Sequence, residues 1–173
     1  MAVVNQYVQN TFIGANGLLL KMDPMTLREQ GAGDFTLQAL FAIAATDTTG
    51  SIYRIFANVP ANYVPIWGTI ANDAMAGLTS ASLGLYSPLL GAVKAIGCFM
   101  TNISMAAATT SASPKTAIDA FQSITLANSQ QKLWQLAGDT LANPVSSYDI
   151  CLTTVAQTGN AGNVLVTLKF AAG

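Results

Sequence analysis

Near its C-terminal end the chain alternates between apolar and other residues, the pattern of a β-strand with one buried face. In NVLVTLKF (163–170) every second residue is apolar, while Thr167 and Lys169 fall on the opposite face. In YDICLTTV (148–155) the alternate residues Tyr148, Ile150 and Leu152 are apolar in the same way. A short turn with two glycines, TGNAGN, joins the two runs. The sequence therefore predicts a terminal β-hairpin.

The same alternation extends upstream as far as Phe35. The runs that carry it are FTLQALFAIAA (35–45), SIYRIF (51–56), NYVPIWGTI (62–70), TSASLGLY (79–86) and IGCFMTNISM (96–105). Turn residues separate them, and no alternating helix–strand units of the parallel kind occur. Seven or eight short strands with regular turn signals predict an all-β fold, an antiparallel β-sandwich of jelly-roll-like form, over residues 35–173.

Three runs carry more specific expectations. In the first run the Leu37 face is apolar and the other face carries Leu40 and Ala42 beside two polar residues, so the strand is expected to be covered on both sides. Pro65 lacks an amide hydrogen and predicts an edge strand or a bulge. In the fourth run the leucines are expected to point inward, and Ser82 and Gly84 outward.

Residues 1–34 form a separate N-terminal arm in this interpretation. Asp23 and Pro24 predict the start of one short helix, and the glycines of 31–33 predict a flexible joint. The arm is too apolar for a disordered tail, so it is expected to pack on its own sandwich, for instance as an extra strand, or on a neighbouring subunit or the capsid surface. One or two short helices or irregular turns are also expected over 115–137.

The composition bears on possible partners. Charged residues make up 9% of the chain, against roughly 25% in an ordinary soluble domain, and the net charge is -1. Without a basic excess, nucleic-acid binding is not expected. The two longest uncharged stretches, 74–93 and 95–114, are too rich in glycine, proline and polar residues to span a membrane. A charge-poor surface favours self-association, as a dimer or trimer.

The chain contains no histidine, which removes the usual general base and the commonest metal ligand. Most aspartates lie apart in predicted turns, where they commonly bond to backbone amides, although two of them meeting in space is not excluded. Cys98 and Cys151 match no metal or redox spacing and are expected to be small buried side chains. We therefore predict no catalytic residue, no cofactor, no metal and no enzymatic activity.

Candidate interaction residues are apolar side chains with no evident place in the core. They are Val4, Tyr7, Phe12 and Ile13 in the arm, with Tyr63 and Trp67 in the third run. Tyr63 and Trp67 are expected on the face opposite Val64 and Ile66, as an anchor between subunits, a platform for a sugar, or side chains packed on the arm or the second sheet.

Several segments resemble small virion proteins of tailed bacteriophages, including head decoration, or cementing, proteins. The segments are DTTGSIYRIFANVPANYVP, IANDAMAG, SLGLY, KLWQLAG, SYDICLTT and AGNVLVTLKF, within residues 47–170. The resemblance implies a jelly-roll-like sandwich on the capsid surface that bridges copies of the major capsid protein. It also implies a virion location after synthesis in the host cytoplasm.

Two other interpretations of the function remain open at this point. One is a tail-fibre or adhesion-type β-sandwich that binds carbohydrate, and the other is the shell protein itself or another capsid or connector subunit. The size of the isolated chain and its binding to empty heads or to glycans separate these readings.

Overall fold

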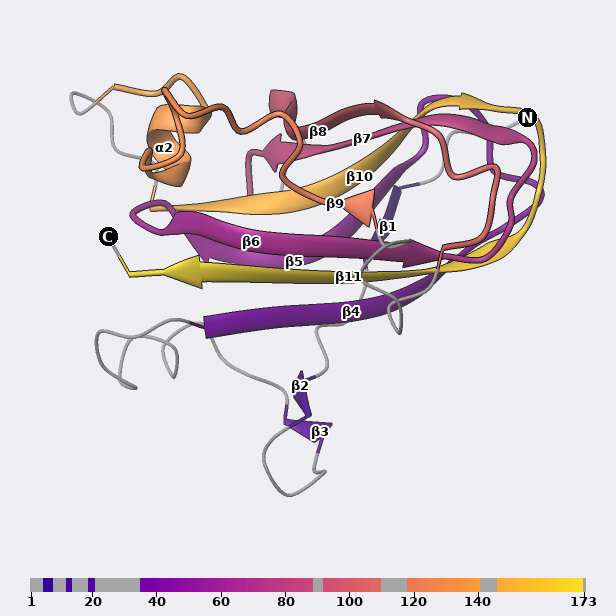
Figure 1. The fold of residues 1–173 in the computed structure, drawn as a ribbon, viewed down its shortest axis with the longest axis horizontal. Helices are drawn as coiled ribbons and strands as arrows, with labels where there is room; N and C mark the ends of the chain where they lie inside the picture. The colour runs from indigo at the N-terminus through magenta and orange to yellow at the C-terminus, as the bar shows by residue number, and fades with distance from the viewer. Residues whose placement is uncertain are drawn as a thin grey trace.

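The chain folds into two β-sheets packed face to face, in a computed structural model of the protein (Figure 1). The structure describes residues 35–88, 92–109, 118–140 and 146–172, together with the strand segments 5–7, 12–13 and 19–20. The main strands are β4 (Phe35–Ile43), β5 (Ile52–Pro60), β6 (Val64–Asn72), β7 (Leu78–Tyr86), β8 (Val93–Ile103), β9 (Ile118–Asp119), β10 (Ser147–Gln157) and β11 (Gly162–Ala171). The predicted all-β sandwich is confirmed.

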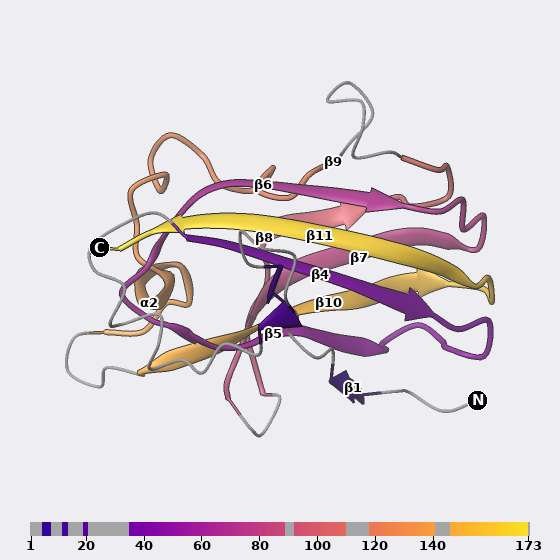
Figure 2. The same cartoon turned by 90° about the horizontal axis from the view of Figure 1, so that it is seen from below.

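The order of the strands is that of a jelly roll. The four-stranded sheet has the order β4-β11-β6-β9, and the five-stranded sheet has the order β1-β5-β10-β7-β8. Numbered from β4 as the first strand, these orders are 1-8-3-6 and 2-7-4-5, which is the arrangement of a double Greek key. Seen from below in Figure 2, β4, β11 and β6 lie in front of the strands of the other sheet.

The predicted terminal hairpin is wrong. β10 pairs with β5 and β7 in the five-stranded sheet, whereas β11 pairs with β4 and β6 in the four-stranded sheet. The turn between them therefore crosses from one sheet to the other. The facing of both strands is as predicted, because Tyr148 and Leu168 are fully buried between the sheets. A short glycine turn permits either connection, and the choice depends on partners far away in the sequence.

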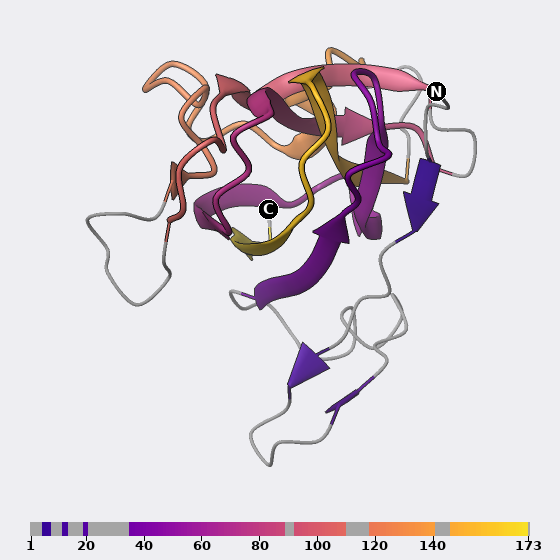
Figure 3. The ribbon, with the colours of Figure 1, turned by 90° about the vertical axis from the view of Figure 1, so that its right-hand side faces the viewer.

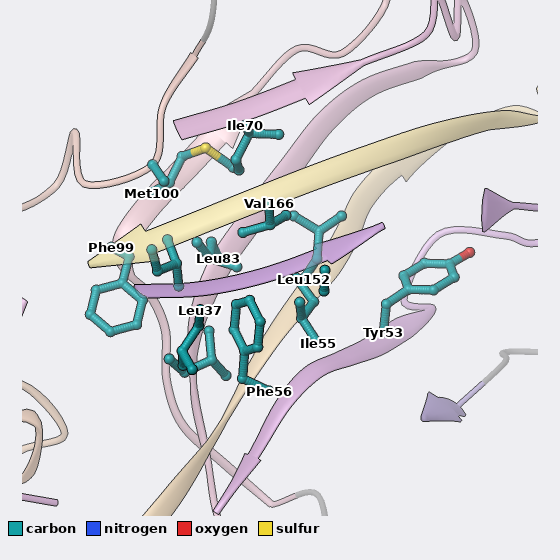
Figure 4. Packing of buried hydrophobic residues seen from close by; sticks show 14 of the residues in the cluster. Leu37, Tyr53, Ile55, Phe56, Ile70, Leu83, Phe99, Met100, Leu152 and Val166 are labelled. Carbon is teal, nitrogen blue, oxygen red and sulfur yellow. The ribbon is translucent and has the colours of Figure 1, made fainter. Parts of the chain in front are cut away.

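Alternating side chains from the two sheets form one core (Figure 4). β4 shows the pattern most clearly, since its burial alternates residue by residue from Leu37 to Ile43. Aromatic side chains close the end of the core near the start of β4, where the rings of Phe35 and Tyr63 lie 4.4 Å apart and those of Phe121 and Phe170 lie 6.0 Å apart. Burial of this apolar surface is the main stabilising contribution to the fold.

Three of the connections between the sheets are described along their whole length and lie at one end of the sandwich, which Figure 3 shows from that side. The ends of β4 and β6 meet the start of β11 there, through the pairs Ile43 with Gly162 and Asn72 with Val164. The loops are joined by backbone hydrogen bonds, including one of 2.9 Å from the Thr158 amide to the Gly77 carbonyl. This end is therefore a bonded cap and not a set of free loops.

Residues 118–140 contain a single helical turn, α2 (Leu133–Leu136), in agreement with the short helix expected there. The helix docks on the loop before β6, where the Leu133 amide donates to the Tyr63 carbonyl at 2.9 Å. Gly138 follows the C-cap residue of this helix, and its φ of 75° is the left-handed conformation that glycine adopts without strain.

The N-terminal part contributes three short strands. β1 (Asn5–Tyr7) runs parallel to β5 at the edge of the five-stranded sheet, with Tyr7 opposite Arg54. β2 (Phe12–Ile13) and β3 (Leu19–Leu20) pair with each other. The short helix expected from Asp23 and the glycine joint at 31–33 lie outside the described residues. The arm as a separate unit remains a prediction.

Ser82 and Gly84 point away from the core as predicted, yet both are buried. The β7–β8 pairing shifts register between Leu83 and Leu85, and the backbone of β8 passes over Gly84. The Ser82 hydroxyl accepts a hydrogen bond of 3.3 Å from the Asn102 amide. The irregular course of β8 explains this burial, because a regular neighbouring strand leaves the outward side of β7 open.

Candidate interaction surface

The aspartates that the structure describes are engaged in structural contacts. Asp47 accepts a hydrogen bond of 2.9 Å from the Ala44 amide, and Asp73 accepts one of 2.9 Å from the Asn163 amide. Asp119 accepts one of 2.8 Å from the Phe121 amide. Asp149 lies 3.9 Å from the Arg54 guanidinium. Within the described part of the chain, no three metal-ligating side chains of the His, Cys, Asp or Glu type lie together.

Asp139 has a more specialised environment beside α2. Its carboxylate accepts hydrogen bonds from the Tyr148 hydroxyl and, at 2.9 Å, from the Lys94 ammonium. The bond from Tyr148, with a smaller contribution from Lys94, lowers the pKa of Asp139 below its usual value. Burial, and to a smaller extent the same contact with Asp139, raise the pKa of Tyr148. This cluster joins β8 and β10 to the segment after α2 and is structural.

The two cysteines are free thiols, of which Cys151 is buried and Cys98 is partly buried. Burial raises the pKa of Cys98 to about 12 and raises the pKa of Cys151 as well. Thiolate is the reactive form of cysteine, so neither side chain has the properties of a nucleophile near neutral pH. In the described residues, no helix is long and apolar enough to cross a membrane.

The most distinctive surface is the outward side of the four-stranded sheet, which we call the outer face. Its side chains include those of Thr36, Gln38, Leu40 and Ala42 on β4, Asn163, Leu165, Thr167 and Lys169 on β11, Trp67, Thr69 and Ala71 on β6, and Asp119 on β9. Among these side chains only Lys169 and Asp119 are charged. The regular pairing of β4 with β11 makes this side of the sheet continuous, with Leu40 directly opposite Leu165.

Two side chains on the outer face are large, apolar and strongly exposed. Leu40 is 66% exposed and Trp67 is 51% exposed. Single exposed apolar side chains are common on proteins, whereas adjacent ones are typical of interaction sites, and Leu40 lies directly opposite Leu165. The sequence pattern predicted that the side of the strand that carries Leu40 is covered, and among the described residues no element covers that side.

The structure separates Tyr63 from Trp67. Tyr63 is 6% exposed and packs against Phe35, whereas Trp67 is on the surface. Ile66 is also exposed, at 49%, although it was expected on the side opposite Trp67. The cause is a bulge, because Phe170 pairs with Pro65 while the preceding Lys169 pairs with Trp67, which leaves Ile66 as the extra residue. The irregularity expected at Pro65 is confirmed, and it turns Ile66 and Trp67 to the same surface.

The arm candidates lie apart from the outer face in the sequence and in the strand order. Tyr7 belongs to β1, at the edge of the other sheet, and Phe12 and Ile13 form β2. Val4 lies outside the described residues. A role for these side chains in contacts remains a prediction. Leu40 and Ile66 are the residues that sequence reasoning missed, and the apolar Leu40 at an outward position was the available signal.

No protein-family model and no curated protein matches this sequence. Solved structures with the same fold do exist. A chain of the cyanophage Pam1 capsid asymmetric unit aligns with a TM-score of 0.53 and 15% identity, covering 83% of this chain and 87% of that chain. A chain of the capsid of Ralstonia phage GP4 aligns with a TM-score of 0.54 and 16% identity, with the same coverage.

Two phage capsids contain chains of this fold. The expected likeness to phage virion proteins is thereby confirmed at the level of the fold. The alignment covers most of both partners, so it reflects the whole sandwich and not a single sheet.

Proposed function

We propose that this chain is a structural virion protein that decorates and cements the head of a tailed bacteriophage. In this role it contacts copies of itself and the major capsid protein on the capsid surface, without catalysis. The observation that carries the proposal is the jelly-roll fold shared with chains of two phage capsids over 83% of this chain. Fold alone does not define function, so the surface chemistry has to agree with it.

The outer face has the chemistry that cementing requires. A cementing subunit makes broad contacts with other protein surfaces, and such contacts are depleted in charge at their centre and enriched in aromatic anchors. Trp67 and Leu40 supply large apolar side chains, while the threonines and Gln38 supply small polar groups around them. We assign this face to protein–protein contact in the virion.

The carbohydrate-binding alternative is less well supported. A sugar platform is usually built from several exposed aromatic side chains beside polar groups, and Tyr63 is buried while Trp67 is exposed. The fold is equally consistent with the remaining alternative, a shell or connector subunit. The assembly of heads without the chain distinguishes that role from cementing.

The test uses heads of the phage that encodes this chain, prepared with the gene for the chain deleted. We expect such heads to assemble, to bind the purified chain saturably, and to become more resistant to heat once it is bound. Trp67→Ser should weaken binding, whereas Val155→Ser, which changes an exposed apolar residue of the other sheet, should not. Failure of heads to assemble without the chain identifies a shell or connector subunit, and absence of binding to assembled heads contradicts the cementing role.

A further inference from the structure

The two sheets of the sandwich have four edges, and three of them are occupied or irregular. β1 covers the edge of β5. β9 and a bridge from Thr109 to Asn72 cover part of the edge of β6. β8 forms the next edge, where three register shifts interrupt its pairing with β7 and Lys94 adds a charge. Bulges, charges and short covering strands are the devices by which natural proteins prevent unwanted strand pairing.

The fourth edge, that of β4, has none of these devices. β4 pairs with β11 through nine consecutive residue pairs without a register shift, so the strand is regular. Its sequence FTLQALFAI contains no charge and no proline. Among the strands that the structure describes, none pairs with its second edge. A long, flat, uncharged edge of this kind is a template for addition of another strand.

We propose that β4 pairs antiparallel with β4 of a second copy of this chain, so that the two four-stranded sheets form one continuous sheet across a two-fold axis. When a strand pairs with the same strand of a second copy, each charged side chain near the axis faces a side chain of like charge. Like charges opposite each other destabilise such pairs. β4 carries no charge, so no such repulsion arises. A two-fold pair also uses the same edge twice and leaves no open edge behind.

Leu40 supports the choice of a second copy as the occupant. It is 66% exposed and follows Ala39, the middle residue of the strand. With Ala39 opposite its own copy, Leu40 lies opposite Gln38 of the second chain, and the two Leu40 side chains are diagonal neighbours on the outer face. Diagonal neighbours of this length can touch. The pairing thus covers, near the axis, the most exposed large apolar side chain of β4.

The inference rests on the self-association included in the proposed function and specifies where it occurs. It is tested on the isolated chain, without heads. Alternate amides of a β-strand point to opposite edges, so in a free β4 only every second amide is bonded to β11. Amide hydrogen exchange of the wild-type chain, followed by NMR, should show slow exchange at consecutive residues of 35–43, in a particle of twice 17.9 kDa.

A pair of charge variants gives a second test. Leu40→Lys and Leu40→Glu each place like charges near the axis and remove apolar contact, so each should weaken the dimer at least about tenfold. Mixing the two variants should restore a dimer that contains one copy of each, because the charges are then opposite. Val155→Lys, an equivalent change on the other sheet, should leave dimerisation unchanged.

Three results overturn the proposal. The first is an oligomer in which alternate amides of β4 exchange fast. The second is a monomer in which the amides toward β11 and those toward the other edge of β4 are both protected. The third is a dimer that is weakened by Thr69→Lys but not by Leu40→Lys. The last result indicates that the sheets meet face to face, since Thr69 lies on β6, away from the edge. Binding of the chain to heads despite any of these results leaves the cementing role intact, so the two proposals fail separately.

Discussion

The carbonyl oxygen of Ala95 lies directly over Gly84, so that a Cβ atom added to Gly84 would be 2.0 Å from it. The same Cβ would lie 2.5 Å from the carbonyl carbon and oxygen of Ile96. All three atoms belong to the backbone of β8 and cannot rotate away as a side chain does. The close approach of β8 to β7 therefore depends on the absence of a side chain at position 84.

Gly84→Ala is expected to destabilise the protein by about 3 kcal/mol, at the upper end of the range for overpacked sites, because β8 has to move. Thermal or urea unfolding measures the change. Gly138→Ala is the matched comparison, since Gly138 has open space around it and only its φ of 75° disfavours a side chain. That variant should lose about 1 kcal/mol. Equal losses in the two variants would show that steric overlap at Gly84 is unimportant.

Leu168→Ala should lower the free energy of unfolding by about 2–5 kcal/mol, because Leu168 is fully buried and its removal leaves a cavity. Leu165→Ala changes the same residue type three positions earlier, on the outer face. It should cost less than about 1 kcal/mol in the isolated chain. Urea unfolding at low protein concentration separates the two, and a larger loss at Leu165 would reverse the assigned facing of β11.

Asn72→Asp should destabilise the protein by at least about 2 kcal/mol, because a carboxylate then faces backbone carbonyls. The Asn72 side-chain nitrogen lies 2.7, 2.9 and 3.1 Å from the carbonyl oxygens of Asp73, Ala107 and Met105. Asn128→Asp is the control, since the Asn128 side-chain oxygen accepts a bond from Thr125 and a carboxylate can do the same. Chemical denaturation of both variants checks this prediction. If Asn72→Asp left the free energy of unfolding unchanged, the amide contacts would contribute little to stability.

The contribution of Asp139 to stability should depend on pH. Its folded-state pKa is lowered, so its carboxylate stabilises the folded protein above the unfolded pKa of about 4, and this contribution is lost as the pH falls through the folded pKa. The stability difference between wild type and Asp139→Asn should therefore be largest near neutral pH and shrink in acid. Lys94→Gln should show a smaller effect, because the bond from Tyr148 is the larger cause. A difference that is constant with pH would exclude the charge as its origin.

Local patterns in the sequence predicted the strands and their inward faces well. Period-two alternation correctly placed Leu168 and Tyr148 in the core, and Pro65 correctly marked an irregularity in β6. These features depend on residues close together in the chain. They are therefore visible without knowledge of the fold.

The errors have a common physical origin in contacts between distant residues. The turn after Gln157 has glycines that suit a hairpin, and only the partners of β10 and β11 show that it crosses between sheets. The exposure of Ile66 beside Trp67 depends on the bulge opposite β11, and the burial of Gly84 depends on the path of β8. The openness of the Leu40 side follows from the absence of a third layer over β4 in the described residues, which local alternation cannot show.

The pairing of β4 with β11 has a consequence for synthesis on the ribosome. β4 is the first strand of the four-stranded sheet to be made and β11 is the last, and the hydrogen bond between Gln38 and Thr167 joins residues 129 positions apart. Closing so long a loop is slow, and it cannot begin until β11 has been translated. A chain cut short before residue 162 therefore has no β11 on which to build a sheet around β4. Such a fragment lacks the sheet whose β4 edge would pair with a second copy, so we expect incomplete chains not to join an ordered array.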